Sequence, residues 1–141
     1  MKIVALDVGT VRIGIAASDI MEIIASPYTV YRRTKSLSSD AKAVADILNN
    51  LGAGEVVIGL PLKLDGSEGA SVQMAKEFGA ELEKLISIPI VYQDERLSTV
   101  SAERVLIESG MRREKRKDKI DSVAATFILQ THLDKKSNLR V

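Results

Sequence analysis

Three carboxylates stand where the sequence predicts that strands or helices end. Asp7 closes the apolar run KIVALDV, Glu95 closes the run IPIVYQDE, and Asp121 opens an amphipathic segment near the C-terminus. In open α/β sheets, ligands bind beyond the carboxyl ends of parallel strands. Carboxylates gathered at such a place would repel one another unless a cation neutralised them. Because the chain has no cysteine and one histidine, the fitting ions are Mg²⁺ or Mn²⁺, and a pair of such ions supports in-line displacement at a phosphodiester.

Each of these carboxylates also has a structural interpretation when it is taken alone. Asp7 lies two residues before a glycine at a possible hairpin turn, and the helix dipole would favour Asp121 at a helix N-terminus. Glu95 could pair with Arg96 or Lys119. A one-residue error in the strand register would also exchange Glu95 with its neighbour as the ligand. The competing carboxylates are Asp19, Asp65 and Asp94.

The hydrophobic pattern predicts the strands that must position these residues. The segments 2–8, 11–18 and 25–33 are typical of a three-stranded antiparallel meander, whose last strand lies at an edge and ends in exposed arginines. Two further apolar runs, 55–59 and 88–93, are typical of parallel strands reached through helical crossovers. The element order βββαβαβαα therefore predicts an α/β fold with a mixed five-stranded sheet flanked by helices.

The helices are predicted from apolar residues that recur every three or four positions. The first is expected to be capped by Ser38 or Ser39 and to stop at Gly52 or Gly54, and a charged linker over 111–119 precedes the last. The other helices are expected over about 68–86, between a cap at Ser98 or Thr99 and Gly110, and from Ile120 onward. The predicted inward positions are Val72, Ala75, Phe78, Leu82 and Leu85 in the second helix, and Ile120, Val123, Ala124, Phe127, Ile128 and Thr131 in the last.

The composition is that of an ordinary globular chain. Of the 141 residues, 45% are apolar and 28% are charged, so one domain over 1–134 is expected, followed by a frayed basic tail over 135–141. The first apolar run is too short for a signal peptide and no stretch of about 18 apolar residues occurs, so the cytoplasm is the expected location. A net charge of +1 means that affinity for nucleic acid must come from local clusters of basic residues.

Four motifs, in the order DVGTVRIGIAASD, IGLPLKLDGSEG, DERLST and KIDSVAATFIL, resemble those of the bacterial YqgF-type proteins. The resemblance covers about residues 2–133. These proteins are described as Holliday junction resolvases and as the nuclease that trims precursor small-subunit (16S) ribosomal RNA, and they share the ribonuclease H-like fold. The resemblance implies that Asp7, Glu95 and Asp121 are the catalytic residues and bind two Mg²⁺ or Mn²⁺ ions.

Basic residues close to these motifs are candidates for binding phosphate groups. The run RREKRKDK over 112–119 would anchor a nucleic-acid backbone, or would be a solvated linker. The stretch GLPLKLDG could hold a phosphate through its backbone amides and a lysine, or could form an ordinary Asp-Gly turn. The single histidine, His132, is expected to be structural or exposed. The expected substrate-binding residues are Thr10, Arg12, Lys63, Arg96, Ser98, Arg112, Arg113, Lys115, Arg116, Lys117 and Lys119.

Three functions remain open on the sequence. The first is a metal-dependent nuclease that acts on precursor ribosomal RNA, within ribosome precursor particles, or on branched DNA. The second is an ATPase, because DVGTVRIGIA also resembles the first phosphate loop of actin-like ATPases and sugar kinases, although 141 residues supply only one of their two lobes. The third is a non-catalytic module of the same fold that binds nucleic acid or a ribosome-assembly partner. A monomer or weak dimer without a membrane partner is expected.

Overall fold

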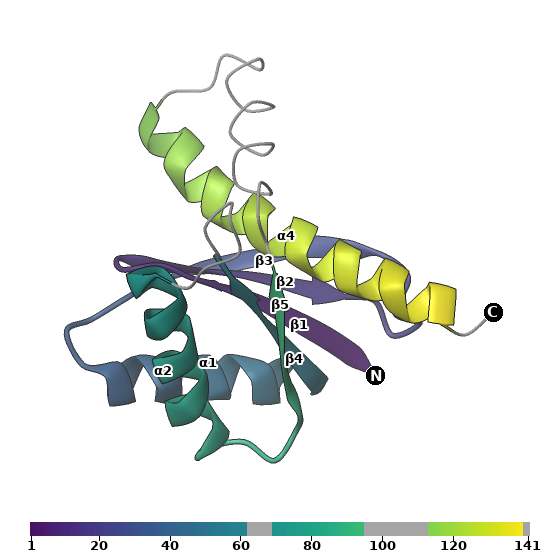
Figure 1. Ribbon diagram of the computed structural model, residues 1–141, viewed down its shortest axis with the longest axis horizontal. Helices are drawn as coiled ribbons and strands as arrows, with labels where there is room; N and C mark the ends of the chain where they lie inside the picture. Colours follow the sequence, from purple (N-terminus) through teal and green to yellow (C-terminus); the bar gives the residue numbers. More distant parts are fainter. Residues whose placement is uncertain (62–68, 95–112, 140–141) are drawn as a thin grey trace.

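Five strands form one mixed sheet in the order β3-β2-β1-β4-β5, as the computed structural model shows (Figure 1). The structure describes residues 1–61, 69–94 and 113–139, with the side chains of 113–122 and 138–139 excepted. The strands β1, β2 and β3 are antiparallel, whereas β4 runs parallel to β1 and β5 parallel to β4, as the sequence predicts. The strands are β1 (Lys2–Val8), β2 (Arg12–Ser18), β3 (Ala25–Arg32), β4 (Ala53–Leu60) and β5 (Ile90–Asp94).

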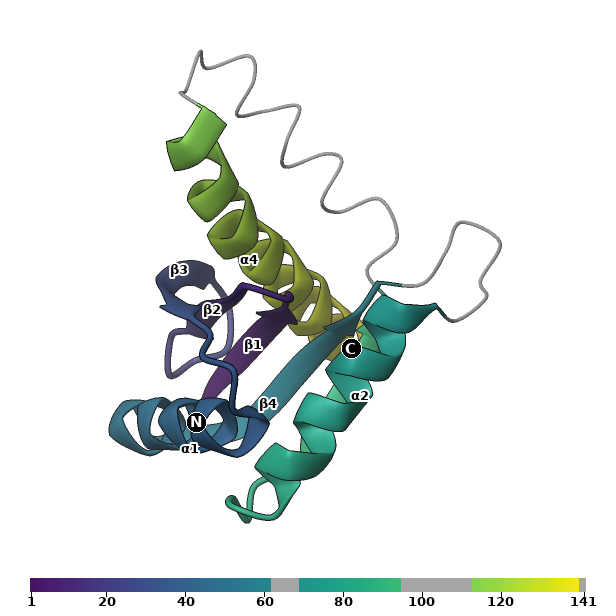
Figure 2. The same cartoon turned by 90° about the vertical axis from the view of Figure 1, so that its left-hand side faces the viewer.

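Alternation of side chains along the central strands divides the core into two layers. Val4, Leu6 and Val8 of β1 pack with α1 (Leu37–Leu51) and α2 (Ala70–Glu83). Ile3 and Ala5 point to the other face and pack with α4 (Arg113–Leu139). Successive strand residues point to opposite faces, so a short apolar run can supply both layers. Figure 2 shows the sheet between α4 on one side and α1 and α2 on the other.

The first helix begins earlier than the sequence pattern predicts. Its cap is Ser36, whose hydroxyl oxygen accepts a hydrogen bond from the backbone N–H of Ser39, so the predicted cap at Ser38 or Ser39 is wrong. Its end is predicted correctly, because Gly52 takes the left-handed conformation with φ 67°. The second helix ends at Glu83, and Leu85, predicted to point inward, lies beyond that end and is 49% exposed.

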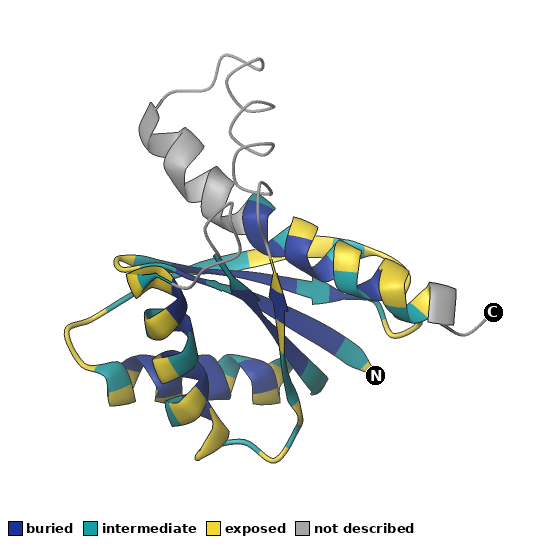
Figure 3. Cartoon of the chain, viewed as in Figure 1, coloured by how far each residue is buried: buried dark blue, intermediate teal, exposed yellow. Residues whose placement is uncertain are grey.

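The last helix is longer than expected and is rotated relative to the predicted face. The segment 113–119 is helical and not a linker, because arginine, lysine and glutamate favour helices even without an apolar stripe. The helix also continues through Leu139, so residues 135–139 are not a frayed tail. Phe127 and Thr131, predicted to face inward, are exposed, and the buried stripe visible in Figure 3 consists of Ala124, Ala125, Ile128, Leu129 and Leu133.

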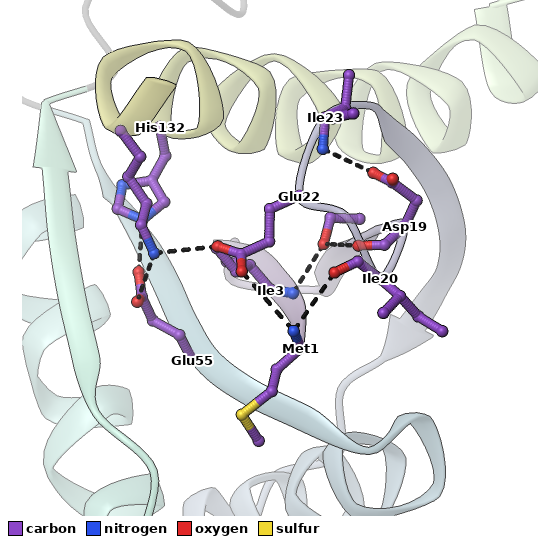
Figure 4. Close-up of polar contacts among 10 residues, drawn as sticks. Met1, Ile3, Asp19, Ile20, Glu22, Ile23, Glu55 and His132 are labelled. Carbon is purple, nitrogen blue, oxygen red and sulfur yellow. Dashed lines mark hydrogen bonds and ion pairs between the residues drawn. The ribbon is translucent and has the colours of Figure 1, made fainter. Parts of the chain in front are cut away.

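Polar contacts hold the C-terminal part of α4 at the end of the sheet where β1 and β4 begin (Figure 4). His132 lies 2.5 Å from Glu55, and the ammonium of Lys136 contacts Glu22 at 3.2 Å and Glu55 at 3.3 Å. Burial alone would lower the pKa of Lys136, but its hydrogen bonds to the two glutamates outweigh that effect and raise the pKa. The expectation of a structural histidine is confirmed. None of the helices in the described ranges is long and apolar enough to cross a lipid bilayer.

Candidate active site

Asp7 lies at the carboxyl end of β1, the central strand of the sheet. It follows Ile3 and Ala5 at two-residue intervals, and both of those residues belong to the core layer under α4. Alternation therefore places the Asp7 carboxylate on the face that α4 covers. The side chain is half-buried, between the fully buried residues of the strand and the exposed turn that follows. The predicted position of this carboxylate at a strand end is confirmed.

Glycine occupies positions beside Asp7 on the same face. Gly14 of β2 is the cross-strand partner of Asp7. Gly59 of β4 stands one residue beyond the pair Leu6–Ile58 and follows Val57, which packs under α4. Since neither glycine carries a side chain, only backbone from β2 and β4 borders the carboxylate at these positions. A glycine inside a strand often marks the close approach of a ligand, which is the signal that could have identified both residues from the sequence.

The direction of α4 brings its N-terminal half toward the carboxyl ends of the strands. The side-chain amide of Gln93, opposite Gly59 on β5, donates to the carbonyl of Ile128 at 2.9 Å. His132, one turn further along α4, contacts Glu55 near the start of β4. The backbone of Asp121 precedes Ile128 by seven residues of α4, two helical turns or about 10 Å, toward the N-terminus of the helix.

The other predicted site residues are distributed as follows. Thr10 is exposed in the turn after β1, and Arg12 begins β2 on the α4 face, opposite Arg32 of β3. The backbone of α4 includes Arg113, Lys115, Arg116, Lys117 and Lys119. Glu95, Lys63, Arg96, Ser98 and Arg112 lie outside the described residues, as does the helix expected between Ser98 and Gly110.

A buried charged network supports the turn that follows Asp7. Asp40, at the start of α1, is fully buried and pairs with Arg33 at 3.0 Å. The side chain of Arg33, expected to be exposed, is only 11% exposed and donates to the carbonyl of Gly9 at 2.9 Å. Sequence reasoning missed this network, because an aspartate in a first helical turn is usually interpreted as complementing the helix dipole.

Hydrogen bonds keep Asp40 ionised in spite of its burial. Desolvation would raise the pKa of its carboxyl group. Hydrogen bonds to the carboxylate outweigh that effect and hold the pKa of Asp40 below 3.8. The donors are the backbone N–H and hydroxyl of Thr34, the guanidinium of Arg33 and the hydroxyl of Tyr31. The charge on Asp40 therefore needs no metal ion for compensation.

The donor chemistry around Asp7 fits a hard divalent cation. A carboxylate provides the oxygen ligands that Mg²⁺ and Mn²⁺ prefer, and the positions beside Asp7 on β2 and β4 are glycines. Among residues whose side chains the structure describes, no group of three His, Asp or Glu could hold a metal ion. Two of the three predicted ligands, the side chains of Glu95 and Asp121, are outside that set.

The fold resembles that of solved RuvC structures. Thermus thermophilus RuvC superposes with a TM-score of 0.58 over 98% of this chain and 97% of that chain, at 12% sequence identity. The T. thermophilus RuvC complex with a Holliday junction substrate gives a TM-score of 0.60 over 97% of this chain and 96% of that chain, at 11% identity. At such low identity the likeness shows the fold alone, and it confirms the predicted ribonuclease H-like architecture.

Sequence comparison gives closer relatives. A protein of Paracoccus denitrificans named "Putative pre-16S rRNA nuclease" is 47% identical over 94% of this chain and 84% of its own length. A protein of the same name from Caldanaerobacter subterraneus subsp. tengcongensis is 45% identical over 98% of this chain and 99% of its own. The model of the RuvX family, described as a Holliday junction resolvase, matches residues 1–135. With that match over nearly its full length, the chain belongs to the RuvX family.

Proposed function

We propose that the protein is a divalent-metal-dependent nuclease that hydrolyses phosphodiester bonds in precursor 16S ribosomal RNA. The observation that carries the proposal is the half-buried carboxylate of Asp7 at the carboxyl end of a central strand, on the face under α4. The names of the relatives supply the substrate class, and membership of the RuvX family favours a nuclease over an ATP-binding lobe.

Asp7, Glu95 and Asp121 are the proposed metal ligands and catalytic residues. These three carboxylates would hold two divalent ions, and the chemistry that such ions would supply is activation of the attacking water and stabilisation of the leaving oxygen. Asp7 contributes its oxygens from a strand whose neighbours at that level are glycines. Glu95 is taken as the second ligand from the family resemblance, and Asp94, the last residue of β5, is the alternative.

A pair of arginines next to this site is proposed to bind the substrate backbone. Arg12 and Arg32 are direct cross-strand partners. Arg12 precedes Gly14, the partner of Asp7, by two residues on β2, so it lies on the same face of the sheet as Asp7. Guanidinium groups bind phosphate through charge-assisted hydrogen bonds, so two arginines at this place suit a nucleic-acid backbone. The remaining proposed substrate contacts are Thr10, Lys63, Arg96, Ser98, Arg112, Arg113, Lys115, Arg116, Lys117 and Lys119.

Replacing Arg32 with glutamine is expected to weaken RNA binding at low salt and to flatten its salt dependence. Each phosphate contact that is lost lowers the slope of log K against log salt by about 1. The measurement is fluorescence anisotropy over a salt series, with Asp7→Asn present in every protein so that RNA is not cut. Lys42→Gln, on the exposed side of α1 under the opposite face, is the matched control. An equal slope for both variants would remove Arg32 from the substrate path.

The proposed function is tested by cleavage of two substrates in parallel. Wild-type protein is incubated with precursor 16S rRNA and with a four-way DNA junction, in Mg²⁺, in Mn²⁺ and in EDTA. Cleavage of the rRNA precursor is expected only with a divalent ion. Cleavage of the junction alone would assign the enzyme to branched DNA instead. Binding of both substrates without cleavage under any condition would contradict a nuclease and would favour a non-catalytic nucleic-acid-binding module.

A further inference from the structure

Arg33 contacts the turn between β1 and β2 at two points. Its backbone N–H donates to the carbonyl of Val11 at 2.7 Å, and its Nη1 donates to the carbonyl of Gly9 at 2.9 Å. The cross-strand pairing of β1 ends at Val8, so these bonds support backbone that the sheet ladder no longer holds. The backbone N–H of Gly9 also donates to the carbonyl of Arg12 at 2.8 Å, which closes the turn.

The guanidinium of Arg33 is itself fixed on three sides. Its Nε donates to Asp40 at 3.0 Å, and its planar group lies over the ring of Phe78, 5.5 Å from the ring centre. Asp40 is fully buried, and its other oxygen accepts hydrogen bonds from Tyr31 and Thr34. Because Phe78 belongs to α2 and Asp40 to α1, the layer below the sheet determines where Arg33 can hold the turn.

We propose that Arg33 is a positioning residue for the active site, which holds the turn after β1 and thereby fixes the carboxylate of Asp7. The proposal rests on the proposed function, because it gives Asp7 a metal to bind. Gly9 is two residues beyond Asp7, and a carbon added at its Cβ position would stand 2.8 Å from the carbonyl oxygen of Arg12. The turn therefore has little room to adjust, and loss of its anchor is expected to displace Asp7. Residues that orient metal ligands contribute about 10- to 100-fold to metal affinity.

Asp40→Asn is the sharpest probe of this role. The oxygen of the new amide can keep the bonds from Tyr31 and Thr34, whereas its NH₂ group faces the Nε–H of Arg33, also a donor. The substitution therefore releases Arg33 and leaves the other partners of position 40 in place. Arg33→Met removes the guanidinium directly. The Mn²⁺ affinity of Arg33→Lys is expected to lie between those of Arg33→Met and wild type. An ammonium cannot donate to both Asp40 and the carbonyl of Gly9 with the geometry of a guanidinium.

Lys136→Met is the matched control. This substitution also removes a partly buried cation, which joins α4 to Glu22 and to Glu55 of β4. Lys136 lies at the end of the sheet where β1 and β4 begin, away from Asp7. All variants are first compared by circular dichroism and denaturation, so that metal binding is measured where each is folded. The primary measurement is Mn²⁺ binding by calorimetry without nucleic acid. The second is the set of amide NMR shifts of residues 9–11, and the third is the Mn²⁺ concentration that gives half-maximal cleavage.

Asp40→Asn and Arg33→Met are expected to weaken Mn²⁺ binding by about tenfold or more, whereas Lys136→Met changes it by less than about twofold. The amide shifts of residues 9–11 are expected to move only in the first two variants. Equal Mn²⁺ affinity in wild type and Arg33→Met, with unchanged shifts over 9–11, would overturn the positioning role. A wild type that binds Mn²⁺ but cleaves no nucleic acid would instead refute the proposed function, and the Mn²⁺ comparison would still decide the role of Arg33.

Discussion

Asp7→Asn is expected to lower phosphodiester cleavage by about 10³-fold or more, because bound metal ions supply several kcal/mol of transition-state stabilisation and each 1.4 kcal/mol is tenfold. An asparagine keeps the size of the side chain but removes the charge that binds the metal. Without metal, the variant is expected to be as stable as wild type or more stable, because at the proposed site it would remove one of three carboxylates that would repel one another. The measurements are single-turnover cleavage of precursor 16S rRNA at saturating Mg²⁺, and urea denaturation in EDTA.

Three further variants sharpen this experiment. Asp46→Asn removes an exposed carboxylate on α1, on the opposite side of the sheet, and is expected to leave cleavage unchanged. Glu95→Gln is expected to match Asp7→Asn, whereas Asp94→Asn is not. Full activity of Asp7→Asn would exclude the proposed site, and a loss confined to Asp94→Asn would move the second ligand by one residue.

Asp40→Asn is expected to lower the free energy of unfolding by about 3 kcal/mol at neutral pH, the lower end of the range for breaking a buried ion pair. The lower end applies because Arg33 keeps 11% of its side chain in contact with water, whereas Asp40 keeps none. The variant leaves the hydrogen bonds from Tyr31 and Thr34 intact, so the loss reports the bond to Arg33. The measurement is urea denaturation of both proteins in the same buffer.

The difference in stability between wild type and Asp40→Asn is expected to depend on pH. The pKa of Asp40 is below 3.8 in the folded protein, so the folded state favours the charged carboxylate more than the unfolded state does. The stabilisation is therefore complete at pH values above 3.8 and is lost as the pH falls through the lower, folded-state pKa. The difference in stability between wild type and Asp40→Asn is expected to shrink as the pH falls below 3.8. A difference that persists undiminished in acid would show that Asp40 does not act through its charge.

The sequence predicted the position of Asp7 because two local rules agree there. Side-chain alternation along β1 fixes the face of the sheet, and the glycine after Val8 fixes where the strand ends. The antiparallel meander of β1, β2 and β3 and the edge position of β3 were predicted for similar reasons, since hairpin spacing and Pro27 are local signals.

Features that depend on contacts between distant elements could not be predicted in this way. The segment 113–119 was interpreted as a linker because it has no apolar stripe, but its residues favour a helix. The rotation of α4 that exposes Phe127 follows from packing of small residues, Ala124 and Ala125, against the sheet. The burial of Asp40 depends on Arg33, whose guanidinium is held by residues of α1 and α2 that the sequence does not place beside it.

The central claim is that Asp7, Glu95 and Asp121 share divalent metal. The most direct test is a crystal structure grown or soaked in Mn²⁺, with anomalous diffraction to locate the ions. The expected result is one or two anomalous peaks bound by oxygens of all three carboxylates, at the carboxyl end of β1. Well-ordered side chains of which any one points away from a common metal site would contradict the claim.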